Sequence, residues 1–445
     1  MGAAINELSA RCPALLVAAP ASGQGKTTVA AALARLHTRA GRRVRAFKVG
    51  PDFLDPYWLE AATGAPVHAL DLWMVGEQGC AAMLHAAAQE NDLIVIEGAM
   101  GLFDGQPSAA DLAERFGVPV VAVVDAGKMA GTFGALAYGL RHYRPGLPWA
   151  GVLANQVASL RHGDMLKAGL RDADDWLGSL PRSADWALRE RHLGLSADLP
   201  ASEALARIDA AADALAATPL AALPLERWAV DFPAPASTSE LPALLAGRRV
   251  AIARDASFAF VYQANLDTLR GMGAELSFFS PLAGEALPDC DAVWLPGGYP
   301  ELYPRQLAEA TASREGLAAH IAAGKPVWAE CGGMMALMDE ICDMEGRSHP
   351  GWGLLPGVTR MQRRLAALGP QQLALPAGTL RGHTFHYSTA ASPLPVVART
   401  ARPDGGSAGQ GGEAVYAHEG VMASYFHAWF ASCPEAVAAL LGGRA

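Results

Sequence analysis

Residues 14–28 read ALLVAAPASGQGKTT, and this stretch decides the fold: an apolar run leads into a glycine-containing turn and then into an alanine-rich segment. The apolar run predicts a buried strand, and the alanine-rich segment predicts a helix. A turn with the sequence GQGKTT at such a junction is typical of a loop that wraps phosphate groups, because its backbone N–H groups and the start of the helix point at the anion. The sequence therefore predicts an α/β domain that binds ATP or GTP.

Each residue type in this loop suits phosphate chemistry. Glycines let backbone N–H groups approach phosphate oxygens closely, a lysine supplies a positive charge, and a threonine hydroxyl is a ligand that Mg²⁺ accepts. Pro20 stands where the full eight-residue pattern has its first glycine, so the match is imperfect. The residues predicted to bind the nucleotide are Gly23, Gly25, Lys26, Thr27 and Thr28.

Two later apolar runs also end in polar residues. Residues 47–56 read FKVGPDFLDP and residues 97–105 read EGAMGLFDG. Parallel strands present ligands at their carboxyl ends, which makes Asp52 and Glu97 candidate Mg²⁺ ligands. Each acid alone is equally typical of a turn or a helix cap. Asn155, after a further apolar run, is a candidate for reading the nucleotide base, although a lone Asn there is more often a turn former.

Short apolar runs alternate with helical patterns along the whole chain, which predicts α/β architecture with mainly parallel sheets covered by helices. A chain of 445 residues exceeds one ordinary core, so we expect two domains. Residues 231–242 (DFPAPASTSELP) predict a linker, which gives domains at 1–232 and 247–445 joined by residues 233–246. Residues 404–412 predict a loop. The predicted strands are 14–19, 44–49, 93–97, 118–124, 150–155, 249–253, 292–295 and 326–330, and the clearest helices of the second domain are 262–271 and 305–323.

Composition excludes several classes of protein. The chain is 51% hydrophobic with a net charge of −9 and has no dense basic run, so a nucleic-acid surface has little support. No apolar run is long enough for a signal peptide or a membrane span. Six scattered cysteines without a CxxC pair favour neither a zinc ribbon nor a disulfide framework, and a reducing cytoplasm fits best.

A second chemical site is predicted where residues 326–335 read PVWAECGGMM. A strand that runs into a nucleophile flanked by small residues is typical of an elbow that exposes the side chain, so Cys331 is the candidate nucleophile. The helix start beneath it is expected to lower the pKa of the thiol. The loop LPGGYPE at 295–301 carries Gly297 and Gly298, whose N–H groups would form an oxyanion hole if the loop faces Cys331; otherwise it is a plain turn. The candidate bases include His383, His386, His418 and His427, and spacing does not choose among them.

Taken together, these motifs resemble the cobyrinic acid or hydrogenobyrinic acid a,c-diamide synthases of cobalamin biosynthesis, which fuse a dethiobiotin-synthetase-like ATPase domain to a glutamine amidotransferase domain. The resemblance covers nearly the whole chain. It rests on the motifs ASGQGKTT (21–28), FKVGPDFLDP (47–56), DLWM (71–74), EGAMGLFDG (97–105), ERHLGL (190–195), LPGGYPEL (295–302), AECGGMM (329–335) and SYFHAWF (424–430).

The resemblance implies a role for each candidate. Thr27, Asp52 and Glu97 would hold Mg²⁺, Lys26 would bind ATP, Lys48 would face the transferred phosphoryl group, and Asn155 would lie near adenine. His427, in a pattern that resembles the family's S-Y-x-H, would be the partner of Cys331. Related amidotransferases often carry an acid two residues after this histidine, but Trp429 stands there. The group that orients His427 is therefore left open between a backbone carbonyl, another acid, and none.

The implied reaction takes ammonia from glutamine through a thioester at Cys331 and uses it to displace phosphate from an acyl phosphate made with ATP. The implied substrate is the corrin ring, amidated at its a and c acetates, and the scheme predicts a passage for ammonia between the sites. Cobyric acid synthase and nickel-sirohydrochlorin a,c-diamide synthase are alternatives, against which GPDFLDP and DLWM argue. A P-loop switch ATPase is an alternative of another class, which would need no Cys331. The metal in the ring, the order of the amidations, the corrin-binding residues and a homodimer are left open.

Overall fold

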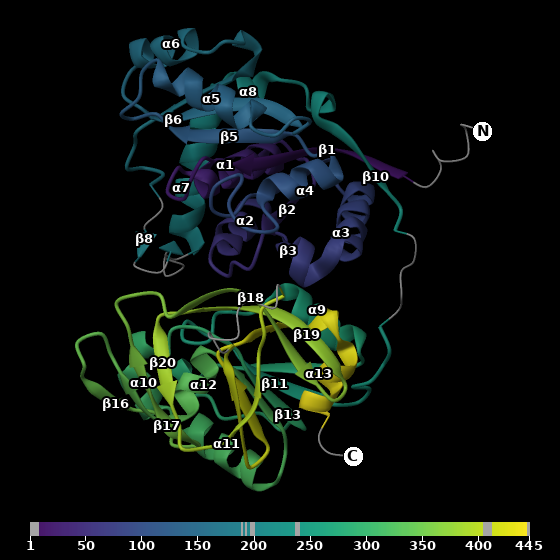
Figure 1. Cartoon of the computed structure of the whole chain (residues 1–445), viewed down its shortest axis with the longest axis vertical. Coiled ribbons are helices and arrows are strands. Elements are labelled where there is room, and N and C mark those ends of the chain that lie inside the picture. Colours follow the sequence, from purple (N-terminus) through teal and green to yellow (C-terminus); the bar gives the residue numbers. More distant parts are fainter. Residues whose placement is uncertain are drawn as a thin grey trace. The chain divides into compact units, whose positions relative to one another are not determined.

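The computed structural model describes residues 9–187, 190–191, 194–195, 201–235, 241–403 and 412–442. The chain divides into two compact units, Met1–Thr238 and Ser239–Ala445, coloured purple to teal and green to yellow in Figure 1. Each unit is built on a mainly parallel sheet with helices, which confirms the predicted fold class. The predicted loop at 404–412 falls outside the described residues except for Gly412, and so do residues 192–193 of the ERHLGL motif.

Unit 1 contains a sheet in the order β3-β2-β4-β1-β5-β6-β7, in which all these neighbours are parallel, and β10 adds to β1 in the antiparallel sense. Its strands are β1 (Ser9–Ala18), β2 (Val44–Val49), β3 (His68–Leu70), β4 (Leu93–Glu97), β5 (Val120–Asp125), β6 (Trp149–Val157), β7 (Trp176–Pro181) and β10 (Ala229–Pro233), with a separate pair β8 (Glu190–Arg191) and β9 (Gly194–Leu195). Because β10 runs to Pro233, residues 231–233 belong to the sheet and not to a linker; residues 236–240 of the predicted linker lie outside the described part.

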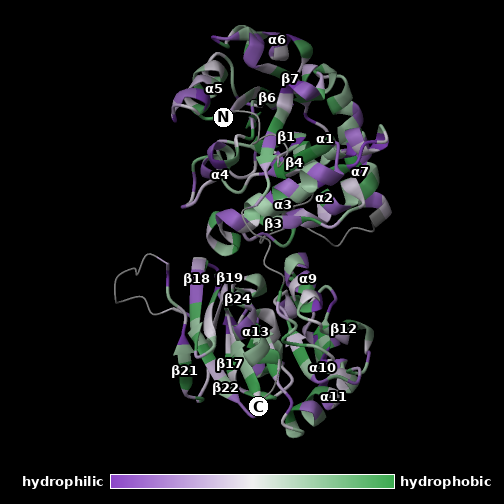
Figure 2. Ribbon diagram, turned by 90° about the vertical axis from the view of Figure 1, so that its right-hand side faces the viewer, coloured by the Kyte–Doolittle hydropathy of each residue, from purple (hydrophilic) through white to green (hydrophobic). Residues whose placement is uncertain are grey.

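Helices cover both faces of this sheet because side chains alternate along each strand. On one face Leu16 of β1 shares a core with Phe133 of α5, and on the other face Leu15 shares a core with Val29 of α1 and Trp58 of α2. The outer helices carry both hydrophilic and hydrophobic residues, as the mixed colours of α5 and α7 in Figure 2 show. The helices are α1 (Lys26–Arg39), α2 (Asp55–Thr63), α3 (Glu77–Glu90), α4 (Ala109–Phe116), α5 (Thr132–His142), α6 (Leu160–Ala168), α7 (Ala201–Ala216) and α8 (Pro219–Ala222).

Strand order brings the first set of site residues together. β4 lies between β1 and β2, and the register pairs Glu97 of β4 with Val17 of β1 and with Lys48 of β2. The phosphate loop follows β1 directly, so the loop, Lys48 and Glu97 meet at the carboxyl edge of three adjacent strands.

Unit 2 contains a sheet in the order β12-β11-β13-β14-β23-β22-β21, parallel from β12 to β23 and antiparallel beyond. Two smaller sheets have the orders β16-β15-β17-β20 and β18-β19-β24. The strands are β11 (Arg249–Ala253), β12 (Glu275–Phe279), β13 (Ala292–Leu295), β14 (Val327–Glu330), β15 (Met338–Cys342), β16 (Ser348–Pro350), β17 (Leu355–Met361), β18 (Ala367–Leu375), β19 (Gly378–His386), β20 (Ser388–Ala391), β21 (Val396–Arg399), β22 (Ala414–His418), β23 (Val421–Ser424) and β24 (His427–Trp429).

The helices of unit 2 are α9 (Gln263–Gly271), α10 (Pro304–Glu309), α11 (Thr311–Ala322), α12 (Gly332–Leu337) and α13 (Pro434–Leu441). The single helix predicted at 305–323 is wrong, because the buried Ala310 leaves the helical region with φ −74° and ψ 54° and separates α10 from α11. In the sheet, β14 lies between β13 and β23, with Leu295 paired to Ala329 and Glu330 paired to Ser424. The loops that follow these three strands therefore share one edge.

Candidate functional site

The phosphate loop has the backbone that its glycines predict. Gly23 and Gly25 adopt φ values of 75° and 94°, a region that favours glycine. A Cβ atom on Gly25 would overlap the side-chain amide of Asn155. That amide donates from Nδ2 to the Gln24 carbonyl at 2.9 Å and accepts at Oδ1 from the Gln156 N–H. The structure therefore places Asn155 against the phosphate loop, with both ends of its amide bonded to backbone.

Lys26 and Thr27, at the start of α1, both turn toward the loop and β4. Lys26 Nζ donates to the carbonyls of Ala21 and Met100 at 3.2 and 2.6 Å, while burial and the charge of Lys48 lower its pKa. Thr27 Oγ1 donates to Glu97 Oε1 at 2.5 Å. The threonine hydroxyl and the Glu97 carboxylate, both predicted as metal ligands, thus lie together beside the loop.

Lys48 lies at the centre of a buried cluster of acids. Its Nζ lies 2.7 Å from Asp55 Oδ2, 3.3 Å from Glu97 Oε1 and 4.0 Å from Asp52 Oδ2, and its side chain is 2% exposed. Burial opposes the charge of Lys48, but these carboxylates outweigh it and raise the pKa of the lysine. Asp55, within the FKVGPDFLDP motif but not a predicted site residue, makes the shortest of these ion pairs.

The carboxylates differ in how they are satisfied. Asp52 Oδ1 accepts the N–H groups of Leu54 and Asp55 at the start of α2, which is a capping role. Burial, with the charge of Asp55, raises the pKa of Glu97 to about 8. Glu97 Oε2 is buried and has no hydrogen-bond partner among the described residues. A buried oxygen without a hydrogen-bond partner costs about 1–3 kcal/mol. A cation bound to Glu97 Oε2 would remove this cost.

These residues fit a nucleotide-bound metal better than a metal cage. Among the described residues, no group of three or more His, Cys, Asp and Glu side chains is arranged to hold a metal. Mg²⁺ that arrives with ATP needs only one or two protein ligands, because phosphates and water supply the rest. The Thr27 hydroxyl and the unsatisfied Glu97 Oε2 meet that requirement.

Cys331 forms a strained elbow between β14 and α12. Its φ of 44° and ψ of −107° are rare for a residue with a side chain, and such a conformation costs about 1–3 kcal/mol. The Cys331 N–H donates to the Ser424 carbonyl at 2.7 Å. A Cβ atom on Gly332 would lie 2.8 Å from both N and O of Gly298. The loop at residues 296–298, called the PGG loop below, therefore faces the elbow. An oxyanion role for the N–H groups of Gly297 and Gly298 requires this arrangement.

Of the four histidines considered, His427 packs on this loop. A Cβ atom on Gly297 would overlap the His427 ring, which is 1% exposed. His383 lies opposite it across the β19–β24 pair and stacks on it at 4.8 Å between ring centroids. His386 instead stacks on Tyr425, and its Nε2 lies 3.0 Å from Oε1 of Glu413. His418 ends β22.

Glu330 and Trp429 lie near Cys331 and His427 in the sequence. Glu330, immediately before the nucleophile, places Oε2 3.9 Å from His427 Nδ1. Trp429, at the position where related enzymes often carry an acid, packs edge-on against Tyr262 at 5.2 Å between ring centroids. Glu330 was not a predicted site residue, although a glutamate that ends the apolar strand VWAE is a signal present in the sequence.

One electrostatic expectation is wrong. The pKa of the Cys331 thiol is raised, not lowered, by burial and by the nearby carboxylates of Glu301, Glu413 and Glu330, whereas a hydrogen bond from the Gly332 N–H acts in the opposite direction. α12 is a helix of six residues, too short to offset this burial.

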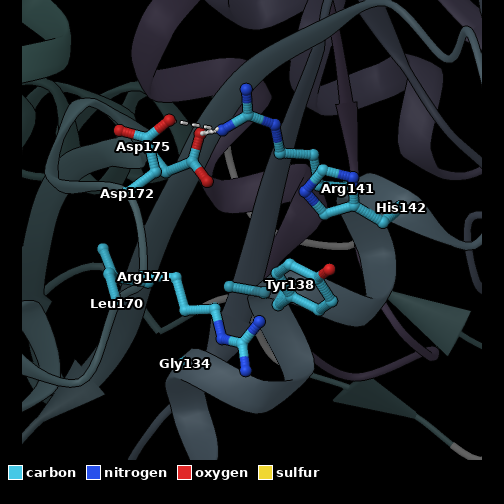
Figure 3. Close-up of a pocket in the computed structure, with 9 residues that line it drawn as sticks. Gly134, Tyr138, Arg141, His142, Leu170, Arg171, Asp172 and Asp175 are labelled. Atoms are coloured by element: carbon cyan, nitrogen blue, oxygen red, sulfur yellow. Dashed lines mark hydrogen bonds and ion pairs between the residues drawn. The ribbon is translucent and has the colours of Figure 1, made fainter.

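A cavity of about 210 Å³ lies elsewhere in unit 1, where α5 meets residues 170–175 (Figure 3). Arg141 there is paired with Asp172 and Asp175 at 2.8 and 2.7 Å, and the Arg171 guanidinium lies 4.7 Å from the Tyr138 ring centroid. Both acids that line the cavity are paired with Arg141, and none of the lining residues is a predicted site residue.

The close packing of the PGG loop gives a stability prediction. Gly298→Ala is expected to lower the free energy of unfolding by about 1–3 kcal/mol, because the added methyl would overlap the Ser257 carbonyl oxygen, which is backbone and cannot turn away. Urea unfolding monitored by tryptophan fluorescence measures the change. Gly139→Ala within α5 is the matched control, because its Cβ would enter open space and alanine favours the helix. Equal stability of the two variants would contradict the packing argument.

Comparison with known proteins finds a family match in each unit. The CobQ/CobB/MinD/ParA nucleotide-binding domain family matches residues 15–194, and the CobB/CobQ-like glutamine amidotransferase family matches residues 249–434. The chain is 57% identical to a hydrogenobyrinate a,c-diamide synthase of Stutzerimonas stutzeri over 97% of this chain and 99% of that protein. It is 56% identical to one of Pseudomonas aeruginosa over 97% and 98%, and 49% identical to a cobyrinate a,c-diamide synthase of Herminiimonas arsenicoxydans over 95% of each.

The fold, the two sites and these matches define a glutamine-dependent amidoligase, which joins a nucleotide-binding domain to a glutamine amidotransferase domain. The chain belongs to the hydrogenobyrinate and cobyrinate a,c-diamide synthase family. The family that the motifs resemble is thereby confirmed, and neither the sister amidoligases nor the switch ATPase is favoured. No helix within the described ranges is long and apolar enough to cross a bilayer.

Proposed function

We propose that this enzyme amidates the a and c acetate carboxylates of hydrogenobyrinate, using ATP and glutamine, in cobalamin biosynthesis. The observation that carries the proposal is 57% identity, over nearly the full length of both chains, to a relative of that name. The relatives of 57% and 56% identity are both named for the cobalt-free ring, whereas that of 49% is named for cobyrinate, and this supports the cobalt-free ring here.

The first half of the proposed reaction converts a ring carboxylate into an acyl phosphate with release of ADP. A carboxylate does not form an amide at neutral pH without such a leaving group. The phosphate loop and Lys26 bind ATP, and Lys48 stabilises the negative charge that develops on the transferred phosphoryl group. Thr27 and Glu97 would hold Mg²⁺, which would neutralise phosphate charge. Asp52 accepts two backbone N–H groups and so holds the start of α2 beside this site. Asn155 holds the phosphate loop through the Gln24 carbonyl and would lie near adenine.

The second half releases ammonia from glutamine. His427 removes the proton of the Cys331 thiol, the thiolate attacks the amide carbon, and the N–H groups of Gly297 and Gly298 stabilise the oxyanion. The C–N bond breaks as His427 returns the proton to the leaving nitrogen, and water then hydrolyses the thioester to glutamate. Ammonia attacks the acyl phosphate, so that phosphate leaves and an amide remains. The six free cysteines support a reducing compartment, and we propose the cytoplasm.

Mass spectrometry of the ring tests this function. With ATP, Mg²⁺, glutamine and hydrogenobyrinate, we expect two successive exchanges of OH for NH₂, and a monoamide that appears first and then declines. Cobyrinate in the same assay tests the choice of ring, and we expect a lower kcat/KM with it. A ring that gains four amides after starting as a diamide, or a ring that gains none, would refute the proposal.

A further inference from the structure

The residue before the nucleophile is buried and held in one orientation. Glu330 is 2% exposed, and its Oε1 accepts the indole N–H of Trp328 at 2.6 Å and the backbone N–H of Ala428 at 3.3 Å. With Oε1 bound from both sides, Oε2 lies 3.9 Å from Nδ1 of His427. Since Ala428 follows His427 directly, the same carboxylate binds the backbone at this point of the chain and lies beside the ring.

Glu330 is the acid that the fold brings beside this ring. Glu413 pairs instead with His386, and Trp429 packs against Tyr262. The groups that face His427 include Glu330, the ring of His383, which stacks on it, the ring of Phe260, and the PGG loop. A histidine that takes a proton from a thiol needs a partner that fixes its tautomer and stabilises the imidazolium, and a carboxylate at Nδ1 supplies both.

We propose that Glu330 is the positioning residue of His427 and so completes a Cys331–His427–Glu330 arrangement. The inference rests on the proposed glutamine chemistry of this site. Glu330 keeps the proton of neutral His427 on Nδ1, which leaves Nε2 to accept the thiol proton. The imidazolium that forms then lies beside the carboxylate, and His427 later gives the proton from Nε2 to the departing ammonia. Glu330 exchanges no proton in this cycle.

The electrostatics of the buried pair support this role. Burial raises the pKa of Glu330 to about 8 and lowers the pKa of His427, and the charges of His383 and His386 lower the latter further. Each group alone is therefore costly to charge, and each becomes easier to charge when the other is charged. The carboxylate therefore stabilises the imidazolium that forms when His427 accepts the thiol proton.

Glu330→Gln tests the proposal, because the glutamine carbonyl accepts the same two N–H bonds but lacks the charge. In the full-length enzyme we expect the kcat/KM for glutamine hydrolysis to fall about 10²-fold or more. Amidation supplied with ammonium chloride is expected to stay within about 2-fold of wild type. Glu309→Gln, on the exposed surface of α10, is the matched control and is expected to behave as wild type.

A pH profile separates this role from a merely structural one. The probe is the rate at which 6-diazo-5-oxo-L-norleucine labels Cys331, measured by mass spectrometry between pH 6 and 9. Loss of the carboxylate is expected to move the midpoint downward by about one pH unit, because the imidazolium loses its counter-charge and the pKa of His427 falls. A structural defect would lower the rate without moving the midpoint. Labelling needs no ring, so failure of the ring assay would leave this test intact.

Two results would overturn the proposal: glutamine hydrolysis by Glu330→Gln within about 3-fold of wild type, or a labelling midpoint that does not move. If Glu330→Gln also loses its ammonium-dependent activity, Glu330→Asp decides. Aspartate keeps the charge on a shorter side chain, so a glutamine-dependent rate above that of Glu330→Gln supports the proposal. A rate equal to or below it refutes the proposal.

Discussion

Cys331→Ser is expected to lower glutamine-dependent amidation by about 10³-fold or more while leaving ammonium-dependent amidation within about 2-fold of wild type. A serine hydroxyl is a far weaker nucleophile than a thiol, and the buried elbow that already raises the pKa of Cys331 would disfavour an alkoxide even more strongly. The ATP-dependent half does not use this residue, so external ammonia bypasses the loss. The measurement is the rate of amide gain on the ring with each nitrogen source.

The matched control for this substitution is Cys433→Ser, which changes a thiol at the start of α13 in the same unit, outside the predicted site. It is expected to retain both activities. Glutamine-dependent product from Cys331→Ser at the wild-type rate would exclude Cys331 as the nucleophile. Loss of the ammonium-dependent rate as well would show that the substitution damages the fold, and thermal unfolding of the two serine variants would then separate the effects.

The parallel parts of the fold were predictable because their strands are buried on both faces. Continuous apolar runs mark such strands, and β2, β4 and β11 begin and end at the predicted residues. The predicted strand at 14–19 missed the first residues of β1, where residues 9–13 pair with β10. That pairing joins segments more than 200 positions apart, and no local pattern indicates it.

The antiparallel strands of unit 2 were not predicted. β18 and β19, for example, include exposed and polar positions, so their apolar pattern is weak, and β19 also pairs with β24, which lies about 45 positions further along the chain. The break at Ala310 was equally hidden, because alanine favours a helix and only tertiary packing displaces it.

The candidate site shows a similar division. Cys331 and the phosphate loop could be proposed because nucleophiles and phosphate-binding groups follow strands in recognisable patterns, whereas His427 was chosen among the histidines only through the family resemblance. The environment of each group could not be predicted from the sequence. The raised pKa of the Cys331 thiol, for example, follows from burial, which the sequence does not show. Asp55 and Glu330 lay inside quoted motifs, but their importance follows only from the Lys48 and His427 atoms that they meet.

Lys48→Met is expected to lower amidation by about 10²-fold or more with either nitrogen source, the opposite pattern to that of Cys331→Ser. Lys48 lies against three carboxylates, and its ammonium group is the positive charge nearest to Asp55 and Glu97. Its removal takes away the charge that would stabilise the transferred phosphoryl group, and it leaves the acids to repel ATP. Labelling of Cys331 by the diazoketone analogue of glutamine is expected to be unchanged, because the thiol site lies in the other unit.

The same substitution is also expected to lower the free energy of unfolding of unit 1 by about 3–5 kcal/mol, because it leaves buried carboxylates without their partner. The activity assays are therefore run at a temperature at which circular dichroism shows that the variant is folded. Lys167→Met, at an exposed position on α6, is the matched control and is expected to retain activity and stability. Amidation by Lys48→Met within about 3-fold of wild type would show that the buried lysine stabilises the fold only, and that Lys26 alone carries the charge at the phosphoryl group.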